Sequence, residues 1–130
     1  DIVLTGGGRT PTEPEADPLS EWLESCAGFR PHARDGDLIL PGHKLPFTGL
    51  PFRLEQMIDN HVSALDRLLD HLSVPRTAVD CFPVLFKRPI GPAEEGLALV
   101  EAMAHLNCLL RRGQVSRSLG ETGAYLWERL

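Results

Sequence analysis

Residues 37–43 of this 130-residue chain read DLILPGH, a short apolar run that ends in a Pro-Gly turn and a histidine. The run over residues 37–41 has the length and apolar density of a short buried strand. His43 would then lie just past the strand end, where the turn fixes the direction of its side chain. Metal sites favour such positions, because the ligands must be oriented before the ion binds. The motif therefore predicts a buried strand followed by a candidate metal ligand.

The segment upstream predicts the end of one strand, an acidic loop and a helix. Residues 1–4 (DIVL) are expected to end a strand, because the glycines at 6–8 cannot continue a regular element. The loop over 11–18 ends in Asp17-Pro18, a favourable N-cap followed by proline at the first helical position. Residues 19–28 then carry apolar side chains at helical spacing. A helix, a buried strand and a sharp loop are typical of the end of an αβ unit within a larger sheet.

Residues 51–72 predict the clearest helix in the chain. Its apolar stripe repeats at helical spacing and leaves the charged side chains on the other faces. The stripe consists of Leu54, Ile58, His61, Leu65, Leu68 and Leu72. At ~1.5 Å per residue this helix would be ~33 Å long, which is enough to join two domains.

The rest of the chain predicts two more helices and a hairpin. A short helix follows Thr77, and a longer one is expected over 93–112, with Gly113 at its C-terminal cap. Two strands, 115–119 and 124–127, are expected around a turn at 120–123. The longer helix is predicted to bury Leu99, Met103, Leu106 and Leu110. A helix, a second helix and a β-hairpin in this order form a winged-helix arrangement, and the fold class is α+β, mainly helical.

Taken together, these segments resemble one branch of the metallo-β-lactamase superfamily. Residues 37–43 resemble its last zinc-ligand motif, an apolar strand followed by Pro-Gly-His. The long helix with His61, and then the pattern AHLxxLxxxGxV over 104–115, resemble the branch with a winged-helix-like C-terminal extension. The resemblance covers 37–130 well and 1–36 loosely. It implies the end of an αββα catalytic domain at residues 1–50, followed by a linking helix and an accessory domain at 51–130.

The same resemblance implies a zinc-dependent hydrolase as the parent protein, with two zinc ions and a small-molecule ester, thioester or lactam, or an RNA phosphodiester, as substrate. His43 would be a metal ligand. Asp1, followed by Ile-Val-Leu, matches the aspartate that bridges the two metals in this family. The family's HxHxDH signature is absent from this sequence. Because one histidine and one aspartate cannot hold two ions that activate water near neutral pH, the chain alone is expected to bind no zinc and to be inactive. No catalytic residue is predicted in it.

Charge argues against a nucleic-acid partner. The formal net charge is −5, and no run of Lys or Arg exceeds two residues, whereas phosphate binding usually needs a concentrated positive face. The alternative that remains is a winged-helix-like module that binds nucleic acid or protein, or that forms a homodimer, without catalysis. Leu126 and Trp127 would be interfacial residues in such a dimer.

The remaining residues predict a protein of the cytoplasm. Cys26, Cys81 and Cys108 are widely spaced in apolar surroundings, so no disulfide framework is visible. No apolar stretch approaches the ~20 residues that a membrane span needs. His61 is expected to pack at the domain junction, with contact to substrate as the alternative, and His105 is expected on the polar side of its helix in a structural role.

Overall fold

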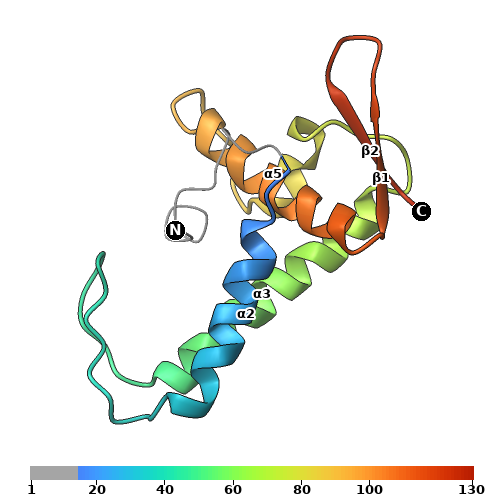
Figure 1. Cartoon of the computed structure of the whole chain (residues 1–130). Coiled ribbons are helices and arrows are strands. Elements are labelled where there is room, and N and C mark those ends of the chain that lie inside the picture. Colours follow the sequence, from blue (N-terminus) through green and yellow to red (C-terminus); the bar gives the residue numbers. More distant parts are fainter. Residues whose placement is uncertain (1–14) are drawn as a thin grey trace.

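The computed structural model describes residues 15–130, and it confirms an α+β fold that is mainly helical. Three helices form the framework: α2 (Pro18–Phe29), α3 (Leu50–His71) and α5 (Glu95–Arg111). Short elements join them: η1 (Arg30–His32), η2 (Val79–Cys81) and α4 (Phe82–Leu85). The chain ends in the antiparallel hairpin of β1 (Val115–Leu119) and β2 (Tyr125–Arg129). Figure 1 shows α2 and α3 side by side, with α5 and the hairpin gathered toward one end of α3.

Helix α2 begins where the sequence predicts. The side chain of Asp17 accepts a hydrogen bond from the backbone N–H of Ser20 at 3.0 Å, and Pro18 occupies the first helical position. Leu19 and Cys26 lie on its buried face. Through this face α2 packs against both α3 and α5, so the helix has the apolar surface that its amphipathic pattern requires.

The predicted stripe of α3 is confirmed along most of its length. Leu54, Leu65 and Leu68 are buried, and Ile58 and His61 are half-buried. The C-terminal half of the stripe lies in the main core, together with the short η2–α4 segment, α5 and β2. The core consists of Leu19, Leu65, Leu68, Leu72, Ala78, Cys81, Ala102, Leu106, Cys108, Leu109, Val115 and Trp127.

The hairpin closes this core. Its register pairs Val115 with Arg129 and Leu119 with Tyr125. Trp127 is fully buried, and its backbone N–H and C=O both pair with Arg76, at 2.8 and 3.0 Å. The hairpin is therefore joined to the segment after α3 by backbone hydrogen bonds as well as by a large apolar side chain.

Helix α5 ends in a Schellman motif centred on Gly113, as the sequence predicts. Gly113 has φ +68°, its N–H bonds to the C=O of Leu110 at 3.0 Å, and the N–H of Gln114 bonds to the C=O of Leu109 at 3.0 Å. This cap directs the chain from α5 straight into β1.

Gly113→Ala is expected to lower the free energy of unfolding by about 1 kcal/mol, because a Cβ is disfavoured at positive φ. Gly96→Ala is a matched control in the same helix. Gly96 is the second residue of α5 and has open space around its Cα, so alanine there is expected to leave the free energy of unfolding unchanged or to raise it by up to about 0.5 kcal/mol. Urea unfolding of both variants checks the pair, and equal effects in the two variants would contradict this account of the cap.

Three predictions about buried and exposed positions are wrong, those for Leu99, His105 and Trp127, whereas Leu106 is buried as predicted. Leu99 is 40% exposed, and α5 instead buries small residues such as Ala98 and Ala102 together with His105, which is 3% exposed and not on a polar side. Alanine allows close helix packing, and α5 has apolar residues on most of its circumference, so its hydrophobic pattern does not select one face. Trp127 is a core residue and is not available as an interfacial one.

The buried strand predicted at 37–41 is also wrong. Only Ile39 pairs, in an isolated antiparallel bridge to Phe47, while Leu38 and Leu40 are 65% and 74% exposed. A strand needs partners on its edges, and within residues 15–130 no further strand lies beside this segment. The strand expected at 1–4 falls outside the described residues, and the domain boundary at residue 50 stays a prediction. Among the described helices, none is long and apolar enough to cross a membrane.

Candidate functional site

His43 lies in the middle of an exposed loop between α2 and α3. The backbone groups of Ile39 and Phe47 pair at 2.8 and 3.1 Å, and the N–H of Gly49 bonds to the C=O of Asp35 at 3.0 Å. These bonds tie the two arms of the loop together and leave 40–46 as its tip. Figure 1 shows the loop extending away from the helices. The Pro-Gly-His motif is therefore displayed to solvent in this chain.

The residues described here do not form a zinc site by themselves. No group of three or more His, Cys, Asp or Glu side chains converges anywhere in residues 15–130. Zinc sites in proteins use three or four protein ligands. His43 can thus supply one ligand, and the others would have to come from elsewhere. Asp1, the second predicted ligand, lies outside the described residues.

Large apolar side chains surround the His43 loop and are left uncovered. Within residues 29–52, five of them are between 63% and 82% exposed: Phe29, Leu38, Leu40, Leu45 and Phe52. They lie on the end of α2, on the loop and on the start of α3. We call this set the apolar rim. Monomeric proteins rarely leave so many large apolar groups uncovered in one short segment.

A second group of interest joins α3 to α5. His105 Nδ1 lies 2.8 Å from the backbone oxygen of Glu101, and His105 Nε2 lies 3.5 Å from His61 Nδ1. Because a carbonyl only accepts, Nδ1 of His105 carries the proton and its Nε2 is a bare acceptor. His61 Nδ1 must then donate to it, in a long hydrogen bond. This assigns the tautomer of both rings and leaves Nε2 of His61 as an unprotonated acceptor.

Both imidazoles are held neutral at pH 7. Burial lowers the pKa of His61 to about 4, and the neighbouring His105 acts in the same direction. Burial also lowers the pKa of His105. The negative charge of Glu101 acts on the pKa of His61 in the opposite direction.

Half-protonation of His61 is therefore expected at about pH 4 in the folded chain, against about 6.5 in urea. Between these values the unfolded state binds a proton that the folded state does not, so acidification from pH 6.5 to 4 removes stability, on the order of 2 kcal/mol after allowance for partial exposure. NMR titration of the imidazole carbons measures the pKa. His61→Phe should reduce the loss of unfolding free energy between pH 6.5 and 4. An unchanged pH dependence in this variant would contradict the assignment of the loss to His61.

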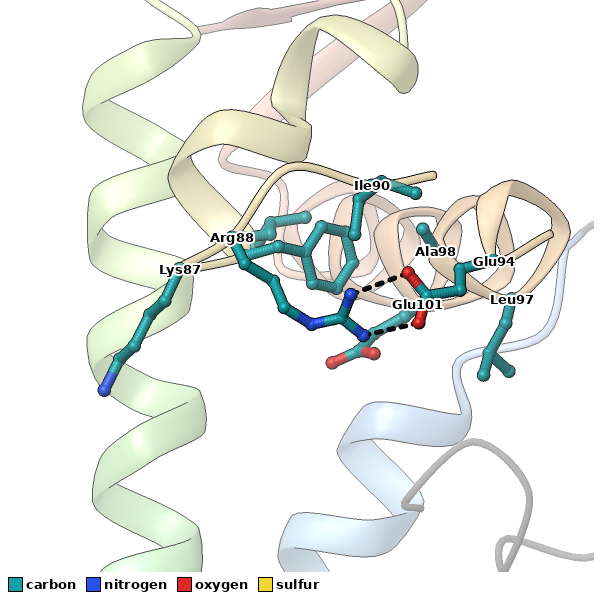
Figure 2. A pocket seen from close by; sticks show the side chains of 9 residues that line it. Lys87, Arg88, Ile90, Glu94, Leu97, Ala98 and Glu101 are labelled. Carbon is teal, nitrogen blue, oxygen red and sulfur yellow. Dashed lines mark hydrogen bonds and ion pairs between the residues drawn. The ribbon is translucent and has the colours of Figure 1, made fainter. Parts of the chain in front are cut away.

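A hollow of about 470 Å³ lies between the loop after α4 and the first half of α5. Its apolar lining consists of Leu85, Phe86, Ile90, Leu97 and Ala98. Figure 2 shows Arg88 and Glu94 facing each other at this hollow, in a two-pronged ion pair of 2.6 and 2.7 Å. Glu101 also lines the hollow, but it takes no part in that pair.

Sequence reasoning missed the partnership of His61, His105 and Glu101. One signal was present, since Glu101 and His105 are four residues apart and must share a face of their helix. The sequence could not show that this face of α5 packs against the apolar stripe of α3, because that contact depends on how α5 is rotated about its own axis.

Comparison with known proteins identifies one matching family and several similar solved structures. The family model described as "Metallo-beta-lactamase-like, C-terminal domain" matches residues 65–130, half of the chain. A β-lactamase domain protein from Burkholderia ambifaria has 34% sequence identity, with a TM-score of 0.86 over 92% of this chain. A metallo-β-lactamase family protein from Thermus thermophilus has 28% identity, with a TM-score of 0.71 over 88%. This chain spans only 36% and 34% of these two structures. No curated protein matches it.

Proposed function

Because the chain belongs to the family of metallo-β-lactamase-like C-terminal domains, we propose that it is the C-terminal part of a zinc-dependent hydrolase. The main support for this proposal is that the structural match includes nearly all of this chain but only a minor part of the matched protein. The Burkholderia ambifaria structure matches 92% of this chain, and 64% of that structure has no counterpart here. Most of a catalytic domain of this kind would precede the chain, and we call the complete protein the parent protein.

The apolar rim supports this arrangement. The rim residues Leu38, Leu40 and Leu45 flank His43 on both sides, so a surface that covers them would also enclose the histidine. Burial of a large aliphatic or aromatic side chain contributes about 1.5–3 kcal/mol, so five such groups would bind a neighbouring domain firmly. We propose that the catalytic domain of the parent protein covers the rim and contributes the remaining zinc ligands beside His43.

Residues 51–130 would then form the accessory domain of the hydrolase, with the winged-helix-like order of helices and hairpin. In this proposal the accessory domain lies at the entrance of the active site and limits which substrates reach it. The substrate classes remain esters, thioesters, lactams and RNA phosphodiesters. The three free cysteines are all buried, which is compatible with a cytoplasmic protein.

A role as a DNA-reading module has less support. A recognition helix must present polar and basic side chains to the major groove. Helix α5 is instead buried from Ala102 to Leu109, apart from the half-buried Met103, and its N-terminal part carries Glu94 and Glu95. The helix that would read DNA is a core element of this fold.

The proposed function is tested by assaying the parent protein and this chain side by side on a thioester, an ester, a β-lactam and an RNA oligonucleotide. The parent protein is expected to hydrolyse at least one of them, to lose the activity with a chelator and to regain it with zinc. The chain alone is expected to hydrolyse none. Chelator-resistant hydrolysis by the parent protein, or turnover by the isolated chain, would reject the proposal.

A further inference from the structure

Three side chains of the proposed accessory domain converge on the chain just before α2. The side-chain N–H of Asn107 donates to the backbone oxygen of Ala16 at 2.9 Å, and Nη2 of Arg111 donates to the backbone oxygen of Glu15 at 3.0 Å. Nη2 of Arg117 pairs with the carboxylate of Glu15 at 2.7 Å. These partners are between 91 and 102 residues apart in the sequence. We call these five residues the entry clamp.

Arg117 has a fixed position in the entry clamp. It lies on β1 opposite Trp127, and its guanidinium carbon is 4.5 Å from the centre of the Tyr125 ring and 5.3 Å from that of Trp127. Its side chain is only 17% exposed. A guanidinium that lies over two aromatic rings is already held when it pairs with a carboxylate. The contact therefore differs from an ion pair between two mobile surface side chains, which contributes little.

The entry clamp is continuous with the packing of α2 on α5. Leu19, the second residue of α2, is 2% exposed and belongs to the same buried cluster as Ala102 of α5. The hydroxyl of Ser20 lies 3.4 Å from Sγ of Cys108. Figure 1 shows that α2 runs from α5, at its first turn, toward the loop that holds His43. The accessory domain thus holds one end of α2, and the other end leads into the His43 loop.

We propose that Asn107, Arg111 and Arg117 are positioning residues of the hydrolase, which fix α2 and the His43 loop relative to the accessory domain. This inference rests on the proposed function, because it requires that the accessory domain lie at the entrance of the active site. Without the entry clamp the accessory domain would be free to shift against the catalytic domain, with no zinc ligand removed. Binding of a bulky substrate, which must pass the accessory domain, is then expected to be weakened more than the chemical step.

A purely stabilising contact is the competing interpretation. Removal of such a contact lowers the melting temperature but leaves KM and kcat of the folded enzyme unchanged. Loss of a positioning contact instead raises KM for a bulky substrate with little change in kcat, the sign of an interaction made equally in the ground state and the transition state. The two interpretations therefore differ in a kinetic result that a change in stability does not produce.

The kinetic test compares variants of the parent protein on a small and a bulky member of whichever substrate class the parent protein hydrolyses. Arg117→Gln is expected to raise KM for the bulky substrate by about fivefold or more, with kcat within about twofold, and to leave the small substrate nearly unchanged. Arg117→Lys keeps the charge and should raise KM less. The matched control is Arg129→Gln, which breaks the 3.3 Å ion pair with Asp70 on the same hairpin and should change neither constant.

Hydrogen exchange of this chain tests the entry clamp without any hydrolysis, so a failure of the clamp is distinguishable from a failure of the proposed function. In Arg117→Gln the backbone amides of residues 20–26 should exchange at least about fivefold faster, because local opening sets their exchange rate. Arg129→Gln should leave these amides unchanged. Should Arg117→Gln fail to fold, Glu15→Gln removes the same ion pair at a side chain that is 64% exposed and keeps Arg117 in place.

Unchanged exchange of the α2 amides would show that the entry clamp does not hold the helix. Faster exchange with an unchanged KM for the bulky substrate, or an equal rise of KM in Arg129→Gln, would overturn the positioning role. A parent protein that hydrolyses none of the substrates would reject the proposed function, and the positioning role with it, whatever the exchange rates show.

Discussion

In the parent protein, His43→Ala is expected to lower kcat/KM by more than about 100-fold. Mutation of a residue that only hydrogen-bonds to a metal ligand typically lowers metal affinity or activity by about 10–100-fold. Removal of the ligand itself should therefore lower activity further. The fold should be largely unaffected, because His43 lies exposed at a loop tip and contributes nothing to the core. The measurement is steady-state kinetics, together with the melting temperature of the same preparation.

His32→Ala is the matched control for this substitution. His32 is also exposed and also lies between α2 and α3, but it is outside the Pro-Gly-His motif. Its removal should leave kcat/KM within about twofold of the original value, since surface substitutions away from a site have small effects. Equal losses in the two variants would show that His43 has no specific role.

Trp127→Ala is expected to lower the free energy of unfolding by about 3–5 kcal/mol, the typical cost of removing a large aromatic side chain from a core. Trp127 is the largest fully buried side chain among the described residues and belongs to the same buried cluster as residues of α3, α5 and β1. In a domain of ordinary stability this loss would leave a large unfolded fraction at 37 °C. Chemical denaturation followed by far-ultraviolet circular dichroism measures it.

Tyr125→Ala provides a control on the same strand. Tyr125 is 47% exposed, and its ring lies 4.5 Å from the guanidinium carbon of Arg117. The loss of this exposed cation–π contact should cost no more than about 1 kcal/mol. A cost for Trp127→Ala as small as this would mean that the hairpin is not an integral part of the core.

Elements with strong local signals could be predicted from the sequence. Asp17-Pro18 fixed the start of α2, the six-residue stripe predicted α3, and Gly113 predicted the end of α5. In each case the cause lies within a few residues of its effect: a capping side chain, a helical period or a positive φ. The hairpin was predictable for the same reason, because its turn residues separate two short strand-forming runs.

Features that depend on distant contacts could not be predicted in this way. The run at 37–41 has the composition of a buried strand, but pairing requires neighbours, and within the described residues only Phe47 supplies one. The buried face of α5 depends on how closely Ala98 and Ala102 approach other helices, which periodicity does not reveal. The partnership of His61 with His105 follows from that rotation and could be found only in three dimensions.

The most direct measurement on the hydrolase is anomalous diffraction at the zinc absorption edge from crystals of the parent protein. We predict an anomalous peak within about 2.0–2.1 Å of an imidazole nitrogen of His43, the usual Zn–N distance. The apolar rim should be covered by the catalytic domain in the same crystals. A zinc peak whose ligands exclude His43, or a His43 loop still exposed to solvent with no metal beside it, would contradict the assignment of this chain to the end of a zinc hydrolase.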